Sequence, residues 1–358
     1  GVGCIHDSLT GSFLLTQDER VLPHDEAVDL LLDAGVTEFG KLSDKKLVSG
    51  KEVFSVLLPD DLNFQGKSKQ GKEVLIKNGV LEKGVMDDNS LGGGKGLLLR
   101  VLHKQYGADR TIHLLQLFSR LGAAYCTYYG FSTGIADSDL PEDVSKAISD
   151  TLASAQKEVQ EVIREYEANE LEVFPGRSAD ETVELKILEL LNRARNKAGE
   201  MVAQNTKRDV PTIIMSSSGA RGNMLNLAQM AAVVGQQAMR GKRIDKGYAG
   251  RTLSCFKKGD LSPEARGFIK AGFKHGLNPK EFFMGNITGR DALMDTALRT
   301  PKSGYLYRRL ANALQDLRVE YDGTVREAGG KIIQFRYGED GVDVAKYENG
   351  KINVKKIV

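Results

Sequence analysis

The feature that most constrains this fold is a helix signal that begins at Asn278 and continues to about Arg318. Asn278 is a favourable N-cap, and Pro279 suits the first helical position. Glu281, three residues after the cap, completes a start that resembles a capping box. At 1.5 Å per residue, roughly forty residues would span roughly 60 Å, which is longer than a compact domain is wide. The sequence therefore predicts one unusually long helix.

This long helix contains residues that weaken helices. Gly285, Gly289, Pro301 and Gly304 all lie inside it. Pro301 removes a backbone hydrogen bond and clashes with the preceding turn, and Gly304 is a poor helix former close behind it. We therefore expect a kink or a flexible point near residues 300–304, a feature that stability alone would not select.

The same helix carries a basic face. Because successive residues advance by about 100°, Arg299, Lys302 and Arg309 fall within roughly 80° of arc. Tyr305 lies beside them, so the face suits phosphates together with a platform on which a base can stack. The alternative interpretation is an ordinary solvated charged face, and the length and expected kink favour a function.

The first part of the chain mixes short strands and helices. The patterns predict a helix over 23–36, a hairpin over 72–84 that turns on Asn78-Gly79, and a helix over 97–125 that breaks near Gly107. Apolar residues at helical spacing then predict two long helices joined by the turn 174–178. The residues alone favour an ordinary antiparallel pair packed in a bundle over a projecting hairpin. The tail predicts hairpins that turn on Gly329-Gly330 and Asn349-Gly350.

Composition limits the class of protein. The 358 residues, 41% hydrophobic, allow sizeable cores and two or three domains. A formal net charge of +2 argues against a purely electrostatic nucleic-acid binder, so any basic site must be local. The three cysteines are far apart and offer no zinc site or disulfide framework. No long apolar run or signal peptide is found, so we expect a soluble, cytoplasmic protein with no membrane partner. The start "GVGCIHDS", without methionine, suggests a piece of something larger.

The stretch "SGARGNMLNLAQMAAVVGQQ", residues 218–237, is a candidate binding element. Gly219 and Gly222 flank Arg221 where "DVPTIIMSSS", interpreted as an extended run, meets a helix. Glycines allow close backbone approach, and amides at a helix start together with an arginine favour an anion. A tight strand-to-helix connection with an exposed arginine explains the pattern equally well.

Other chemical signals are weak. "LGGGKGLLL" is not a phosphate loop, because Lys95 is followed by Gly96 rather than by Ser or Thr. The acids of "MDDN", residues 86–89, could bind a divalent cation, but a solvated turn is the preferred interpretation. His113, within an apolar helix, is interpreted as a core histidine. No local pattern indicates a catalytic triad or a zinc hydrolase.

Several collinear segments carry a family resemblance. They are "IHDSLTGSFLLT", "SVLLPDDLNF", "NGVLEKGVMD", "SGARGNMLNLAQMAAVVGQQAMRGKRI", "LSPEARGFIKAGFKHGLNPKEFF", "DTALRTPKSGYLYRRLANALQDLRVEYDGTVR" and "IIQFRYGEDGVD". Together they resemble the largest subunit of multisubunit DNA-directed RNA polymerases, and the paired glutamines with "GKRI" are closer to the archaeal and eukaryotic branch. The resemblance covers almost the whole chain in order.

The resemblance implies an α+β fold that forms one multidomain piece of the polymerase. It divides the chain into a mixed β/α pore region at 1–135 and a funnel with its helical hairpin at 136–275. A kinked bridge helix at 276–318 and β-hairpins of the cleft at 319–358 follow. In this family the funnel surrounds the channel through which nucleoside triphosphates enter, and the bridge helix crosses the cleft beside the active site. This replaces the interpretation of the hairpin as a simple bundle pair.

The resemblance also implies roles for individual residues. Thr300 and Pro301 match the pair that faces the template base and the nascent base pair, and Tyr305 matches an aromatic residue next to downstream template DNA. The basic positions of the bridge helix are Arg299, Arg308 and Arg309, and Gly304 is the flexible glycine between them. Arg221, beside Gly219, matches a basic residue of the substrate pore. The positions on the funnel and cleft wall are Arg195, Gln229, Gln236 and Gln237.

The family motif that binds magnesium is absent from this chain, so the resemblance implies Mg²⁺ held by a segment outside it, no catalytic residue within it, and no zinc. The trigger loop is absent too. Pro301 stands where relatives often have alanine or serine, and "MGNITGRDAL" departs from the commoner form of the helix start. The implied partners are the remainder of the largest subunit, its C-terminal partner subunit, the second-largest subunit, DNA template, RNA transcript and nucleoside triphosphates.

Two other functions remain as alternatives at this point. One is a non-catalytic nucleic-acid-binding protein that uses the basic helix alone, which the near-neutral net charge disfavours. The other is an assembly scaffold in which the long helix is only a brace, which Pro301 and Gly304 inside that helix disfavour.

Overall fold

A computed structural model of the chain describes residues 1–358 except 207–208, 246, 344–346, 349–350 and 353–358. Two compact units are present, residues 1–285 and residues 286–358. Helices dominate, and the strands form small antiparallel sheets, as the α+β prediction requires. No helix among the described residues is long and apolar enough to cross a membrane.

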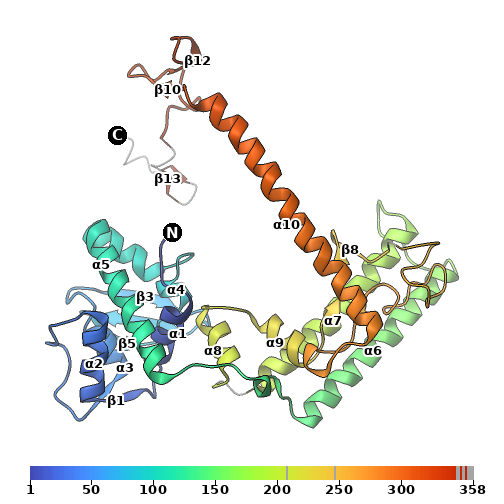
Figure 1. The fold of residues 1–358 in the computed structure, drawn as a ribbon, viewed down its shortest axis with the longest axis horizontal. Coiled ribbons are helices and arrows are strands. Elements are labelled where there is room, and N and C mark those ends of the chain that lie inside the picture. Colours follow the sequence, from blue (N-terminus) through green and yellow to red (C-terminus); the bar gives the residue numbers. More distant parts are fainter. Residues whose placement is uncertain (207–208, 246, 344–346, 349–350, 353–358) are drawn as a thin grey trace. The chain divides into compact units, whose positions relative to one another are not determined.

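Residues 1–138 form a mixed region around one apolar core (Figure 1). Helix α5 (Leu97–Tyr129) packs against α1 (His6–Leu15) and α2 (His24–Ala34). As predicted, α5 breaks at Gly107, whose φ of 80° lies in the left-handed region. The shorter elements of this region are β1 (Val21–Pro23), β2 (Leu47–Ser49), α3 (Gly50–Ser55), β3 (Phe64–Lys67), β4 (Glu73–Lys77), β5 (Val80–Lys83), α4 (Asp88–Leu91) and η1 (Ile135–Ser138).

The predicted hairpin over 72–84 is confirmed. β4 pairs with β5 across the Asn78-Gly79 turn, and both turn residues have positive φ. β3 adds to the other side of β4, so the three strands form one sheet in the order β3-β4-β5. The tight turn 68–72 connects β3 to β4.

The long helical hairpin is also present. Helices α6 (Glu142–Glu167) and α7 (Ala179–Asn205) lie side by side (Figure 1). Ser178 caps α7, because its hydroxyl oxygen accepts a hydrogen bond from Glu181 N–H at 3.2 Å. Their apolar stripes form a second core with the helix α9 (Met224–Ala231) and with Phe268. The hairpin is therefore packed along part of its length, as an ordinary helical pair would be.

Helix α8 (Pro211–Ser218) joins the two cores. Ile214 belongs to the core of residues 1–138, whereas its neighbour Ile213 belongs to the core built on α6 and α7. The prediction that 209–218 is extended was wrong. Only Val210 before Pro211 is extended, because a proline restricts the residue that precedes it, and Pro211 then serves as the first residue of a helix.

After α9 the chain forms short paired strands that hold the base of the last helix. β6 (Gly235–Gln236) pairs with β9 (Phe268–Ile269), and β7 (Ala238–Met239) pairs with β8 (Lys242–Arg243). The short 3-10 helix η2 (Phe273–His275) leads to α10.

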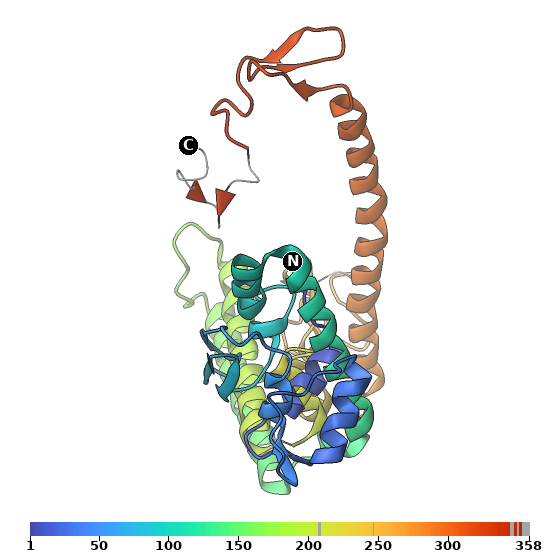
Figure 2. The ribbon, with the colours of Figure 1, turned by 90° about the vertical axis from the view of Figure 1, so that its left-hand side faces the viewer.

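Helix α10 (Pro279–Leu314) has 36 residues and ends four residues before the predicted Arg318. The predicted capping box is confirmed, because Glu281 N–H donates to Asn278 Oδ1 at 2.9 Å and Asn278 N–H donates to Glu281 Oε2 at 3.1 Å. The helix is continuous through Pro301, and Figure 2 shows α10 as one gently curved helix. Flexibility at residues 300–304 thus stays a prediction.

The unit 286–358 ends in small sheets. β10 (Arg318–Val319), β11 (Val325–Arg326) and β12 (Ile332–Gln334) pair in that order, which confirms the hairpin at Gly329-Gly330. β13 (Tyr347–Glu348) pairs with β14 (Lys351–Ile352) as predicted, but the turn at Asn349-Gly350 lies outside the described residues.

Candidate functional site

Arg221 lies in the corner between α8 and α9. Gly219 ends α8 with a φ of 82°, and Asn223 caps α9 by accepting a hydrogen bond from Asn226 N–H at 3.0 Å. Arg221 is exposed, and no hydrogen bond or ion pair of its guanidinium is found in the described part of the chain. Its position therefore depends on the corner backbone alone.

Gly219 is required at this corner for two reasons. Its positive φ is strained for any residue with a side chain. A Cβ placed on Gly219 would also lie 2.4 Å from Asp88 Cβ, which is closer than real contacts allow. The glycine therefore lets the corner approach the segment 86–91 of the first region, far away in the sequence.

Three of the four predicted wall residues meet around strand β6. The Arg195 side chain packs on Gly235, where an added Cβ would lie 2.8 Å from Arg195 Cδ. Gln236 Nε2 donates to Arg266 O at 2.7 Å, and Gln229 Nε2 lies 3.4 Å from Val234 O. Helices α7 and α9 thus bring Arg195 and Gln229 to the strand that carries Gln236.

Gln237 is held by its backbone, since its N–H donates to Gly267 O at 2.8 Å. Gln236 keeps one unsatisfied atom, because its buried Oε1 accepts no hydrogen bond in the part of the chain that the structure describes. The two glutamines therefore bind the segment 266–267 differently. Gln236 does so through its side-chain amide, and Gln237 does so through its backbone N–H.

Glu281 connects this wall to the root of α10, a contact that sequence reasoning missed. The side chain is only 8% exposed, and its Oε1 accepts from Lys270 N–H at 2.9 Å while Oε2 serves the cap. Lys270 directly follows β9, the partner of β6. One carboxylate thus fixes the first turn of α10 to the strand pair that carries Gln236. The capping pattern indicated Glu281, but not this second role.

The predicted bridge-helix residues are all exposed on α10: Arg299, Thr300, Pro301, Gly304, Tyr305, Arg308 and Arg309. Tyr305 is 62% exposed, and the Arg309 guanidinium carbon lies 4.4 Å from the centroid of its ring. Such a cation–π contact leaves the other face of the ring free to stack.

The basic face of α10 is less uniform than its composition indicates. Arg299 Nε lies 2.7 Å from Asp295 Oδ2, and this hydrogen-bonded carboxylate raises the pKa of Arg299. Arg308 lies nine residues after Arg299, about 180° away around a helix, so it cannot share a face with Arg299. Arg309 and Lys302 stay within the predicted arc.

The "GKRI" segment provides a buried arginine. Arg243 is 4% exposed; its Nη2 donates to Leu261 O at 2.8 Å, and its Nη1 lies 3.4 Å from a carboxylate oxygen of Glu184. Burial lowers the pKa of Arg243 to about 10, and Glu184 opposes the change. This arginine holds β8 against α7 and the 261–262 loop, which is a structural role.

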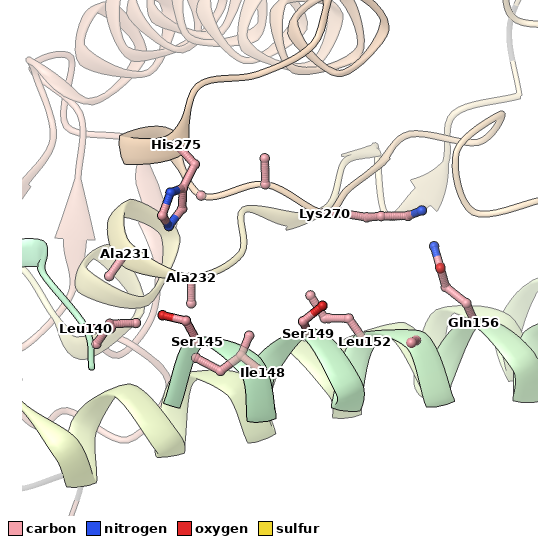
Figure 3. Close-up of a pocket in the computed structure, with 13 residues that line it drawn as sticks. Leu140, Ser145, Ile148, Ser149, Leu152, Gln156, Ala231, Ala232, Lys270 and His275 are labelled. Carbon is pink, nitrogen blue, oxygen red and sulfur yellow. The ribbon is translucent and has the colours of Figure 1, made fainter. Parts of the chain in front are cut away.

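A pocket of about 400 Å³ lies between α6 and the loop 270–275 (Figure 3). Ile148 and Leu152 of α6 form apolar walls, and Ser145, Lys270 and His275 add polar groups. None of the predicted site residues lines this pocket, so sequence reasoning gave no signal for it.

Two minor predictions were wrong. Asp87 is buried rather than part of a solvated turn: it caps α4 by accepting from Asn89 N–H at 3.1 Å and also accepts from Lys69 N–H. Burial raises the pKa of Asp87, although these donors act in the opposite direction. His113 is exposed on α5, because its side of the helix faces away from the core.

The described residues hold no group of three or more His, Cys, Asp or Glu side chains that suits a metal ion. Asp87, the best carboxylate of the "MDDN" stretch, already accepts backbone hydrogen bonds. The described residues therefore offer no donor set for the implied Mg²⁺.

Three family models match the chain in order. RNA polymerase Rpb1, domain 3, matches residues 2–138, domain 4 matches 163–269, and domain 5 matches 276–358. Curated relatives named DNA-directed RNA polymerase subunit Rpo1N are similar over most of the chain. That of Methanocaldococcus jannaschii is 42% identical over 377 residues, which covers 100% of this chain and 28% of the relative.

Two further relatives of the same name extend this finding. The protein of Methanothermobacter thermautotrophicus is 42% identical, covering 98% of this chain and 42% of the relative. That of Halococcus morrhuae is 45% identical over 293 residues, covering 81% of this chain and 84% of the relative. The chain thus spans 28% and 42% of the length of the first two relatives. It belongs to the Rpb1/Rpo1N family and corresponds to part of the largest subunit of an archaeal-type DNA-directed RNA polymerase.

Proposed function

We propose that this chain forms the pore and funnel through which nucleoside triphosphates reach the polymerase active site, together with the bridge helix beside it. The pore region is residues 1–135, the funnel 136–275, the bridge helix 276–318 and the cleft hairpins 319–358. The observation that carries the proposal is a 36-residue helix on which the matched basic and aromatic residues are exposed. The alternatives are a separate nucleic-acid-binding protein and an assembly scaffold.

On α10 the proposed roles follow from side-chain chemistry. Arg299, Lys302 and Arg309 would contact phosphates of template DNA, and Tyr305 would stack against a base. Thr300, whose hydroxyl donates to Thr296 O at 3.0 Å, would face the base pair that forms with the incoming nucleotide. The chain would supply positioning, while template-directed nucleotidyl transfer itself, with its magnesium ions, would require the rest of the subunit and its partners.

In the funnel the proposed role is electrostatic. Arg221 is exposed at the corner between α8 and α9, and among the described residues its guanidinium has no ion pair, so its charge would attract the triphosphate of an incoming nucleotide. Arg195, Gln229, Gln236 and Gln237 would form the wall next to the root of α10. DNA template, RNA transcript, nucleoside triphosphates and the other polymerase subunits are the proposed partners.

The experiment is extension of a primed DNA–RNA scaffold by a polymerase reconstituted from this chain and the remaining archaeal subunits. We expect Tyr305→Ala and Thr300→Ala to change the elongation rate severalfold, since stacking on an aromatic residue contributes about 1–3 kcal/mol per base. Matched controls are Tyr307→Ala, a second exposed tyrosine of α10 (73% exposed), and Thr296→Ala, whose hydroxyl donates to Ala292 O at 3.0 Å.

The outcomes separate the alternatives. A rate that stays unchanged in the Tyr305 and Thr300 variants would favour the scaffold function, in which α10 is a brace. Salt-dependent DNA binding by this chain without other subunits would favour the separate nucleic-acid-binding protein. Rate changes in these two variants and not in the controls support a bridge helix.

A further inference from the structure

The corner that carries Arg221 is held from the side by the first region of the chain. Lys69 Nζ donates to Ser216 O at 2.9 Å, across 147 residues of sequence. Ser216 lies in the last turn of α8, where carbonyl groups have no partner within the helix. A cation at this end of a helix also interacts favourably with the helix dipole.

Lys69 is itself held in place by its backbone. It lies in the turn 68–72 between β3 and β4. Two hydrogen bonds close this turn: Lys72 N–H donates to Ser68 Oγ at 3.1 Å, and Ser68 N–H donates to Lys72 O at 2.8 Å. Lys69 N–H donates to the buried carboxylate of Asp87, which also caps α4. The backbone of Lys69, from which the exposed side chain extends, is therefore held by hydrogen bonds.

The carbonyl that Lys69 binds belongs to the hydrogen-bond set that shapes the corner. Gly219 N–H donates to the same Ser216 O at 3.3 Å, and Arg221 N–H donates to Met215 O at 3.4 Å. Ser218 Oγ donates to Met215 O at 3.1 Å. These contacts are long, so a further donor at Ser216 O contributes to the order of the corner.

Asp88 limits the roles that Lys69 can have. A Cβ built on Gly219 would lie 2.4 Å from Asp88 Cβ and 3.5 Å from Lys69 Nζ. The Asp88 carboxylate and the Lys69 ammonium group therefore both lie near this corner. Their charges oppose one another for an approaching anion. A direct phosphate contact by Lys69 is therefore less favourable than a role in which it orders the backbone.

We infer that Lys69 is a positioning residue for Arg221: it fastens the end of α8 to the β3–β4 turn and so keeps Arg221 where it attracts nucleoside triphosphates. This inference rests on the proposed substrate pore. It makes the first region, the match to Rpb1 domain 3, responsible for the position of a residue in the match to domain 4.

The test uses the reconstituted polymerase and a double-mutant cycle of Lys69→Met and Arg221→Gln, with the KM for nucleoside triphosphates and kcat measured on a primed scaffold. Arg221→Gln should raise KM about three- to tenfold with little change in kcat, as expected for loss of a guiding charge. Lys69→Met should raise KM by a smaller factor, Lys69→Arg should restore it, and Lys67→Met, an exposed lysine two residues earlier, should leave it unchanged.

The double variant distinguishes positioning from a direct charge effect. If Lys69 acts through Arg221, the double variant has the KM of Arg221→Gln alone. If the two effects multiply, Lys69 acts by its own charge and the inference is overturned. It is also overturned if Lys69→Met leaves KM unchanged while Arg221→Gln raises it.

A second readout does not depend on turnover. Hydrogen–deuterium exchange of the peptide 215–224 in the assembled enzyme should be faster in Lys69→Met and normal in Lys69→Arg. Unchanged exchange in Lys69→Met overturns the inference. Failure of the proposed pore is recognised separately, because in that case Arg221→Gln itself leaves KM unchanged.

Discussion

At the scale of single residues, Gly219 shows how a pattern in the sequence reports a contact elsewhere in the fold. The two glycines around Arg221 indicated close approach of backbone to something, and an anion was one interpretation. The structure supplies a different partner for Gly219, namely Asp88 of the first region. Packing against Asp88 thus accounts for a glycine at position 219, and its part in binding stays a prediction.

This explanation predicts unequal effects of two similar substitutions. Gly219 and Gly176 have nearly the same φ, 82° and 78°, but a Cβ on Gly176 would meet nothing within 4 Å. Both alanine variants incur about 1–2 kcal/mol for the left-handed conformation. Gly219→Ala adds a clash, which costs about 1–3 kcal/mol more.

Hydrogen–deuterium exchange around each site in the assembled enzyme checks this difference, because local opening becomes about tenfold more frequent for each 1.4 kcal/mol lost. Equal loss of protection in Gly219→Ala and Gly176→Ala would show that Asp88 does not constrain the corner.

At the scale of an element, α10 combines a hydrogen-bonded first turn at residues 279–282 with a long exposed segment after Met284. The root is fixed by Glu281, whose two oxygens serve Lys270 and Asn278. Beyond Met284 no residue of the helix is buried within its own unit. Among the residues that weaken the helix, Pro301 has the largest local effect, because it removes a backbone hydrogen bond.

Pro301→Ala tests this argument. Alanine restores the N–H that can donate to Ala297 O and removes the clash of the ring, a change of about 3 kcal/mol in helix preference. We expect amide exchange of residues 297–305 to slow at least about tenfold, and elongation to change with it if α10 has the proposed bridge-helix function. If exchange stays at the wild-type rate, Pro301 does not loosen the helix. Pro279, at the first helical position, lacks this effect because its missing N–H has no partner in the helix.

At the scale of the whole molecule, the unit 1–285 contains two apolar cores that meet at α8. Ile213 and Ile214 are neighbours in sequence, and they are 8% and 5% exposed, yet each packs into a different core. A helix so short can serve both because adjacent residues point about 100° apart.

The two alanine variants should therefore loosen different regions. Each removes a buried side chain at about 2–5 kcal/mol. Ile214→Ala should increase exchange in α1 and α5, whereas Ile213→Ala should increase exchange in α6 and α7. The same exchange pattern for both variants would mean that the cores behave as one cooperative unit.

The sequence predicted those features that depend on nearby residues. The capping box at Asn278, the break at Gly107 and the Asn78-Gly79 hairpin all depend on contacts within a few residues, and all three are confirmed. The extended run before Ser218 was predicted wrongly, because an eight-residue helix without a clear stripe gives little periodic signal. The buried state of Asp87 was also missed, since its burial depends on distant segments.

For the candidate site, the sequence by itself determined which residue types are present and the family to which they belong, because the family motifs occur in the chain in the same order. Only the tertiary structure decided which of them meet: Arg195 with Gly235, Glu281 with Lys270, and Lys69 with the end of α8. The physical reason is the range of the interactions. Caps, turns and helix periods are set by neighbours along the chain, whereas these contacts join residues whose separation carries no local signal, and only the fold brings them together.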